Sequence, residues 1–205
     1  MEYPQFSICA HLDLTAFVRF RRERGLPFFS GSLYPSTRAA NGAKEFRYQI
    51  WGEALVEHER GFPTITVMGA NRTFGNTTVE YAWKAGRLLE RAVEVIARTK
   101  ERPTITKKPD QDEVTYYTSF PWVSSTASTH PISLPANSIP RIAWGKYSAD
   151  ENRVLLPYSV QIHHGLADGL HVGNHFNLFK SLLDQPEVEF SADPESRSDA
   201  SSPTP

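Results

Sequence analysis

Apolar side chains alternate with polar ones in several short stretches of the chain, and in other stretches they recur every three or four positions. Alternation is typical of a strand with one buried face, whereas the longer spacing is typical of an amphipathic helix. We therefore expect strands at Phe6–Leu12, Phe46–Glu57, Thr64–Met68, Val114–Ser119, Arg141–Tyr147 and Val154–His163. The polar stretch Ser148–Arg153 predicts a hairpin between the last two strands.

The strongest helical pattern spans Thr78–Thr99, where apolar residues fall on one face. Asp13 and Thr15 are residue types that begin helices, and they precede a second predicted helix at Ala16–Arg24. Further helices are expected at Phe28–Ala43 and Leu170–Leu183. Strands and helices mixed in this way predict an α+β fold.

The 205 residues suit one domain, which we place at residues 1–184. Residues 185–205 are rich in serine, proline and acids. Such a segment buries too little apolar surface to offset the entropy of ordering, so we expect a disordered tail.

Composition excludes several classes of protein. The chain has 22 basic and 23 acidic residues, which gives no electrostatic reason to expect nucleic acid or an anionic membrane as a partner. The single cysteine, Cys9, rules out an intramolecular disulfide and fits a small buried side chain. No apolar run is long enough to span a bilayer, and the N-terminal residues lack the pattern of a signal peptide. We therefore expect a cytoplasmic protein.

Candidate chemistry is concentrated in residues 163–171, with the sequence HHGLADGLH. A predicted strand delivers His163 and His164, and a glycine-containing turn then leads through Asp168 into a helix. One interpretation is structural, with Asp168 forming a turn. A second is a metal site drawn from His163, His164, Asp168, His171 and His175. Adjacent strand residues point to opposite faces, which counts against both histidines binding one ion.

A third interpretation is general base catalysis. Neutral imidazole accepts a proton near neutral pH, and the end of a strand gives the ring a rigid support. The residues by themselves leave the three interpretations open.

The segment HHxxxDG resembles the chloramphenicol acetyltransferase superfamily. The similarity extends in family order through six further segments, from about Tyr3 to Asp184: residues 4–10, 12–15, 37–41, 44–47, 121–124 and 145–147. The resemblance implies a two-layer sandwich, in which helices pack on one face of a mixed β-sheet. It also implies a homotrimer whose active sites lie between subunits.

The resemblance assigns roles to individual residues. His164 would be the general base, and Thr118, at the position of a family serine, would stabilise the oxyanion. Lys146 and Tyr147 match positions near the coenzyme A channel. The resemblance thus implies transfer of an acetyl group from acetyl-CoA, as co-substrate without a bound cofactor, to a small-molecule hydroxyl, with chloramphenicol and antibiotic resistance as candidates.

Two departures from the family pattern stand out. Ser128 and His130 occupy a stretch where the family has apolar acceptor-binding residues, so we expect a more polar acceptor. Asp168 matches a family aspartate whose arginine partner lies in an N-terminal segment that this sequence lacks; Arg19, Arg21, Arg22 and Arg24 are the nearby candidates. A catalytically weakened or inactive trimer acting as a binding module is therefore the alternative hypothesis, and a carrier-protein thioester donor is a third.

Overall fold

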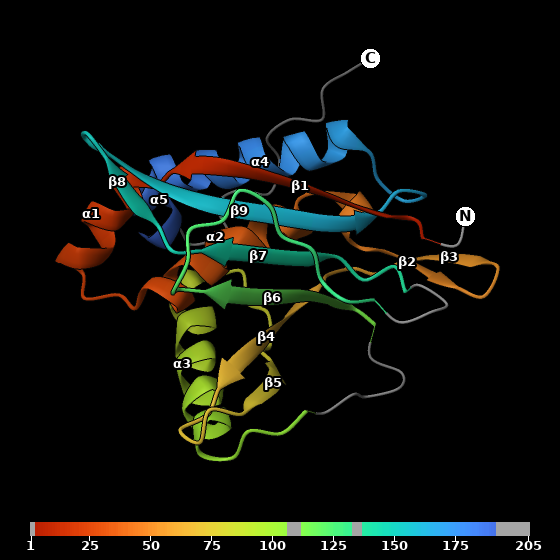
Figure 1. Cartoon of the computed structure of the whole chain (residues 1–205), viewed down its shortest axis with the longest axis horizontal. Coiled ribbons are helices and arrows are strands. Elements are labelled where there is room, and N and C mark those ends of the chain that lie inside the picture. The colour runs from red at the N-terminus through yellow and green to blue at the C-terminus, as the bar shows by residue number, and fades with distance from the viewer. Residues whose placement is uncertain (1–2, 106–111, 133–136, 192–205) are drawn as a thin grey trace.

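The computed structural model describes residues 3–105, 112–132 and 137–191. Its main feature is a seven-stranded sheet, with helices packed against one face (Figure 1). The strands are β1 (Gln5–Asp13), β2 (Tyr48–Trp51), β3 (Ala54–Glu57), β4 (Phe62–Met68), β5 (Phe74–Thr78), β6 (Val114–Phe120), β7 (Arg141–Gly145), β8 (Ser148–Asp150) and β9 (Arg153–His163). The helices are α1 (Thr15–Glu23), α2 (Phe28–Asn41), the 3-10 turn η1 (Lys44–Phe46), α3 (Ala85–Glu101), α4 (Gly169–Asp184) and α5 (Pro186–Ser191).

The strand order is β1-β9-β7-β6-β4-β5, and β8 pairs with the start of β9. The β4–β6 and β6–β7 pairs are parallel and the others in this sheet are antiparallel, so the sheet is mixed as expected. A separate hairpin joins β2 to β3. No described helix is both long and apolar enough to cross a bilayer.

Side-chain alternation along the central strands separates a core face from a polar face. Tyr117, Ile142 and Val160 lie in register on β6, β7 and β9 and are buried beneath the helices. Their neighbours Thr118, Ala143 and Ser159 point to the opposite face. The connector that follows β6 crosses this polar face (Figure 1), where Ser7 Oγ donates to Ser128 O at 2.8 Å.

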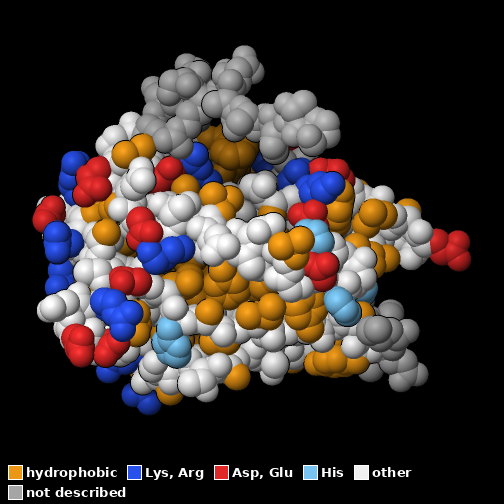
Figure 2. Space-filling view, turned by 90° about the horizontal axis from the view of Figure 1, so that it is seen from above, with side chains coloured by type: hydrophobic (Ala, Val, Ile, Leu, Met, Phe, Trp, Pro, Cys, Tyr) orange, Lys and Arg blue, Asp and Glu red, His pale blue; other side chains and the backbone are white. Residues whose placement is uncertain are grey.

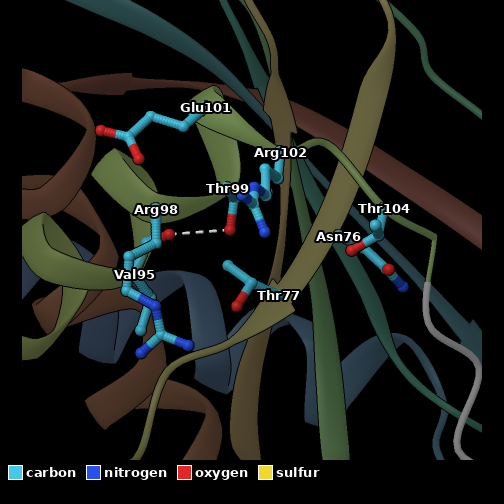
Figure 3. A pocket seen from close by; sticks show the side chains of 8 residues that line it. All are labelled: Asn76, Thr77, Val95, Arg98, Thr99, Glu101, Arg102 and Thr104. Atoms are coloured by element: carbon cyan, nitrogen blue, oxygen red, sulfur yellow. Dashed lines mark hydrogen bonds between the residues drawn. The ribbon is translucent and has the colours of Figure 1, made fainter.

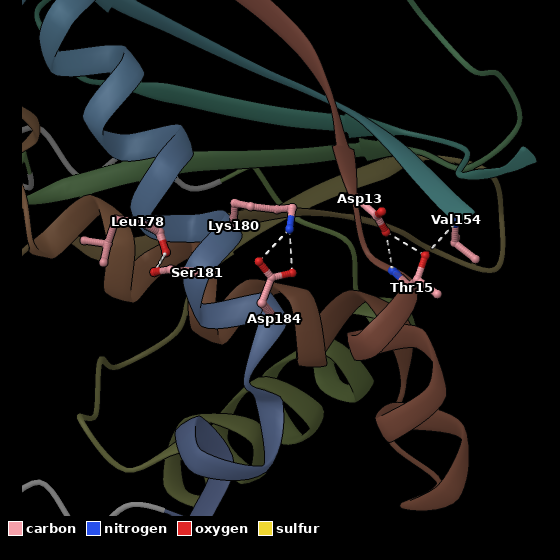
Figure 4. A network of polar contacts seen from close by, with 7 residues as sticks. All are labelled: Asp13, Thr15, Val154, Leu178, Lys180, Ser181 and Asp184. Atoms are coloured by element: carbon pink, nitrogen blue, oxygen red, sulfur yellow. Dashed lines mark hydrogen bonds and ion pairs between the residues drawn. The ribbon is translucent and has the colours of Figure 1, made fainter. Parts of the chain in front are cut away.

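Short polar contacts fix where α1 begins. Asp13 Oδ1 accepts from the backbone N of Thr15 at 2.9 Å, and Thr15 Oγ1 accepts from Val154 N at 2.9 Å (Figure 4). The first contact supplies an acceptor to an unpaired N–H of the helix start, and the second ties α1 to β9. The hydroxyl and backbone N–H of Thr15 lower the pKa of Asp13.

Two of the expected elements are corrected by the structure. The predicted strand Phe46–Glu57 is the β2–β3 hairpin, because Gly52, with φ of +58°, turns the chain. The predicted helix Thr78–Thr99 begins only at Ala85, because Thr78 ends β5, a strand that the pattern did not predict. The stretch between them, residues 79–84, has no regular secondary structure, and Val79 and Tyr81 within it are buried.

The predicted disordered tail is wrong for Pro186–Ser191, which form α5. Phe190 lies 5.3 Å from the rings of both Phe20 and Tyr34, and Glu189 forms an ion pair with Arg38. One aromatic side chain and one partly buried ion pair thus anchor this short helix. The remaining tail, residues 192–205, and part of the polar connector expected at Thr104–Glu113 lie outside the described residues.

A buried polar chain runs through the core. The hydroxyl of Tyr158 lies 2.6 Å from Ser36 Oγ and 2.9 Å from His175 Nε2. Burial lowers the pKa of His175 to about 3, so the ring is neutral in the folded protein at ordinary pH. In the unfolded chain the same ring takes up a proton near pH 6.5.

This difference predicts a loss of stability in acid. Between about pH 6.5 and pH 3 the unfolded state binds the extra proton, so the free energy of unfolding falls as pH falls, by up to about 1.4 kcal/mol per pH unit. The contribution is fully present above pH 6.5. In His175→Phe, denaturant unfolding at pH 7.5 and pH 5 should show a smaller difference than in the wild type. The exposed control His11→Gln should leave the difference unchanged, and an unchanged difference in His175→Phe would contradict this account.

Candidate active site

His164 follows the last residue of β9 and is exposed. Its backbone N donates to Pro4 O at 2.7 Å, and its ring makes an edge contact with Phe6 at 5.2 Å. Nδ1 lies 3.2 Å from Ala167 O, and a carbonyl can only accept, so Nδ1 carries the proton. Nε2 then presents its lone pair, and it has no hydrogen-bond partner among the described residues.

His163 differs from its neighbour. Its Nδ1 accepts from the backbone N of Gly165 at 3.1 Å, and partial burial lowers the pKa of the ring. That nitrogen is committed to the turn that carries His164. Histidine side chains gather at the end of the molecule toward which β9 runs, beside an apolar band (Figure 2).

Asp168 begins α4 as its N-cap. Its Oδ1 accepts from the backbone N of Leu170 at 2.8 Å and of His171 at 3.2 Å. The His171 backbone bond, followed by that of Leu170, lowers the pKa of Asp168. In the described part of the chain no arginine pairs with Asp168, so none of the four arginines at positions 19, 21, 22 and 24 takes the expected role.

His171 is the side-chain partner of Asp168 instead. Its Nδ1 accepts from the backbone N of Asp168 at 3.1 Å and lies 2.8 Å from Asp168 Oδ1, and its Nε2 lies 3.5 Å from Glu45 Oε1 at η1. The side chain thus bridges the loop that carries His164 to the segment beside α2. The sequence marks Glu45 only as part of a segment similar to the family, and its contact with His171 depends on the tertiary packing.

His171→Ala should therefore misplace the His164 loop. We expect kcat to fall by up to roughly 10²-fold, the scale of a misplacement of about 1 Å. The KM for acetyl-CoA should change little, because no described contact links His171 to the pocket beside Lys146. Steady-state kinetics checks this expectation, with circular dichroism to establish folding. An unchanged kcat would remove His171 from the account.

Thr118 lies near the end of β6 on the polar face, half-buried, with its hydroxyl 3.3 Å from that of Thr66 on β4. In the sheet register, Thr118 on β6 pairs with Ala143 on β7, and Ala143 pairs with Ser159 on β9. His164 lies five residues beyond Ser159 along the chain. At about 3.4 Å per residue and about 4.8 Å per strand, Thr118 and His164 are roughly 20 Å apart. One chain does not bring the two residues together.

Lys146 and Tyr147 line a pocket of about 480 Å³ at the carboxyl ends of β4, β6 and β7. Thr66 and Ser119 reach the same pocket, which joins it to the surroundings of Thr118. Gly145 allows the connector to approach: an added Cβ would meet Val123 O at 2.6 Å, where Lys146 N now donates to that oxygen at 2.8 Å. Lys146 and Tyr147 thus lie together at this pocket, directly after a position where only glycine fits without a clash.

Ser128 and His130 lie in the connector over β1 and β9, away from the pocket beside Lys146. His130 N donates to Gln161 Oε1 at 2.6 Å. Burial, and then the nearby positive charge of Arg141, lower the pKa of His130. Their role toward an acceptor stays a prediction.

Comparisons with known proteins decide the family. The profile of the family described as chloramphenicol acetyltransferase matches residues 3–180. The chain belongs to the chloramphenicol acetyltransferase family. It is therefore an acyltransferase, as the resemblance implied.

Similarity to individual proteins supports the same family assignment. The chloramphenicol acetyltransferase of Clostridium perfringens is 29% identical over 187 residues, covering 89% of this chain and 85% of that protein. Chloramphenicol acetyltransferase 2 of Haemophilus influenzae is 27% identical, covering 87% and 85%. A solved chloramphenicol acetyltransferase structure shares the fold with a TM-score of 0.79, at 23% identity and covering 89% of each chain. A probable dihydrolipoamide acetyltransferase of Listeria monocytogenes has a TM-score of 0.69 at 15% identity, covering 90% and 86%.

This acetyltransferase-family fold has a second hollow away from the histidine-rich turn. A hollow of about 510 Å³ between β5 and α3 is lined by Arg98, Arg102 and polar residues (Figure 3), and it contains no residue that the sequence selected. Within the described ranges, no group of three His, Cys, Asp or Glu side chains is placed to hold a metal ion. The metal interpretation of the histidine-rich segment therefore has no cluster to support it there.

The pocket beside Lys146 and Tyr147 also contains residues that the sequence did not indicate. Lys100, from the end of α3, lines it with Lys146, and Phe28 and Phe29 of α2 supply apolar walls. Phe28 lies 4.9 Å from the ring of Tyr147. Nothing in the local sequence marks these residues, because three separate elements bring them together.

Proposed function

We propose that the protein transfers the acetyl group of acetyl-CoA to a hydroxyl of a small molecule, with His164 as the general base. The observation that carries this proposal is the exposed His164 ring, whose Nδ1–H is held by Ala167 O so that Nε2 is free to accept a proton. The names of the relatives make chloramphenicol one candidate acceptor.

The proposed reaction is a direct transfer. Nε2 of His164 removes the hydroxyl proton as the oxygen attacks the thioester carbonyl carbon. The resulting oxyanion accepts a hydrogen bond from Thr118 Oγ1. The intermediate then expels the coenzyme A thiolate, which takes the proton back from the imidazolium to leave an ester and free thiol.

We propose further that each site is shared between two copies of the chain. His164 and Thr118, roughly 20 Å apart in one chain, can serve one reaction only if they come from different copies. A trimer, the assembly that the resemblance implies, has the closed symmetry to repeat such an interface. Under this proposal one copy supplies the base and its neighbour supplies Thr118 and the donor pocket.

The pocket beside Lys146 suits the coenzyme A arm. Lys146 and Lys100 provide two positive charges for its phosphates, and the apolar walls suit the pantetheine chain. The end of the pocket at Thr66 leads to Thr118, where the thioester would react.

Lys146→Gln should therefore weaken donor binding selectively. We expect the KM for acetyl-CoA to rise about tenfold, while an acetyl thioester of N-acetylcysteamine, which lacks phosphates, should show no change. The surface variant Arg153→Gln is a matched control. An equal effect on both donors would show that Lys146 does not meet the phosphates.

The function is tested by release of free thiol. Purified protein is mixed with acetyl-CoA and a panel of alcohols that includes chloramphenicol. Acceptor-dependent thiol release supports the proposal, and product analysis by mass spectrometry should show an acetyl ester. Absence of release with every acceptor would favour the alternative, a binding module of the same fold.

A further inference from the structure

Arg141 on β7 is a buried cation with no acidic partner in the described part of the chain. Arg141 is only 5% exposed. The two hydrogen bonds that its side chain donates go to neutral groups. One guanidinium nitrogen donates to Ile139 O at 3.0 Å and another to Asn137 Oδ1 at 2.9 Å. A guanidinium has five N–H donors, so these contacts leave donors to spare. A buried charge is costly unless an opposite charge compensates it.

The surroundings of Arg141 offer further polar groups to a ligand. Its guanidinium carbon lies 5.9 Å from the centre of the Tyr116 ring. Nε2 of His130 is buried and has no hydrogen-bond partner in the described residues. Arg141 lies close enough to His130 to act on it electrostatically, so the two side chains form a cluster, and neither of them pairs with a carboxylate in the described part of the chain.

The cluster lies next to the proposed reaction centre. Arg141 stands opposite Tyr116, two residues before Thr118 on the same face of the sheet. The α-carbons of Arg141 and Thr118 are therefore about 8 Å apart. The pocket beside Lys146 reaches Thr118 from the other side, through Thr66. Donor pocket, Thr118 and Arg141 thus follow one another along the strands.

We propose that the acceptor alcohol carries an anionic group, a carboxylate or a phosphate monoester, which binds Arg141 and His130. This inference rests on the proposed function, since it names the substrate class of that site. With the anion at Arg141, the reacting hydroxyl at Thr118 lies on the order of 5–8 Å away, which suits a linker of a few carbon atoms. Chloramphenicol has no such group and should be a poor acceptor.

Turnover of matched acceptors tests the proposal in the wild-type protein. Two pairs test a carboxylate: 4-hydroxybutanoate with 4-hydroxybutanamide, and 6-hydroxyhexanoate with its amide. A third pair, glycerol 1-phosphate with glycerol, tests a phosphate. We expect the anionic member of at least one pair to have the higher kcat/KM by about ten- to hundredfold, the scale of a charge-assisted hydrogen bond. In Arg141→Gln this preference should disappear, whereas Arg153→Gln should keep it. If the neutral member of every pair has the same kcat/KM as its anionic partner, the proposal is wrong.

Binding separates this inference from the proposed function. Calorimetry with butanoate, hexanoate and inorganic phosphate on the His164→Ala protein requires no catalysis. We expect binding of at least one anion, its loss in His164→Ala/Arg141→Gln and partial retention in His164→Ala/Arg141→Lys. Anion binding without turnover of any alcohol would reject acetyl transfer and keep the anion site. If the folded protein binds none of these anions, the proposed site is wrong. The site is also wrong if Arg141→Gln changes the oligomeric state but keeps the preference for anionic acceptors, because Arg141 would then pair with an acid of another copy.

Discussion

Replacing His164 with alanine should lower the rate of acetyl transfer by about 10²–10⁴-fold, the usual contribution of a general base. The hydroxyl of an alcohol is a weak nucleophile until its proton is removed as the bond forms. Nε2 is the nitrogen placed to take that proton, because Nδ1 is engaged with Ala167 O. The ring is exposed, so its loss should leave the fold intact.

Measurement of kcat/KM with the best acceptor checks this expectation. Thermal unfolding of the variant should match the wild type to within a few degrees, because only the ring contact with Phe6 and the hydrogen bond to Ala167 O are lost. His11→Ala, an exposed histidine on β1, is the matched control and should retain full activity. A His164→Ala protein with near-normal turnover would show that another group acts as the base.

Thr118→Val should produce the second-largest loss, about 10²–10³-fold in kcat, as expected when an oxyanion donor is removed. Valine keeps the shape and branching of threonine and lacks only the hydroxyl donor, so the strand should be undisturbed. Thr118→Ser keeps the donor and should restore most of the activity.

Thr77→Val makes the same change on β5, at the hollow between β5 and α3, and should have little effect. KM values for acetyl-CoA should remain similar in all three variants, because the donor pocket is unchanged. A loss in Thr118→Ser as large as that in Thr118→Val would point to packing rather than to the hydroxyl.

Much of the fold could be predicted from the sequence because its signals are local. Strand β9 and helix α4 stand out by pattern, and the turn between them carries His164 and Asp168 in one short segment. The errors arose where local signals were weak. Gly52 divides an apolar stretch that reads as one strand, and Phe190 anchors α5 within a segment whose average composition predicts disorder.

The candidate site could be predicted only as separate parts. Position relative to the family pattern selects Thr118 and Lys146, but strand pairing determines that Thr118 lies far from His164. The surroundings of His171 and Arg141 also depend on tertiary packing, since Glu45 and His130 come from distant segments. Arg141 itself reads as an ordinary strand residue until its burial is known.

The central claim, a site built from His164 of one copy and Thr118 of another, is tested most directly by mixing two inactive variants. His164→Ala and Thr118→Val chains carrying different purification tags are refolded or expressed together, and the mixed oligomers are isolated through both tags. Each mixed trimer contains two copies of one variant and one of the other, so about one of its three interfaces joins an intact His164 to an intact Thr118. We therefore expect the isolated mixed trimers to recover roughly a third of wild-type activity, far above either parent. Activity no greater than that of the two parents would contradict a shared site.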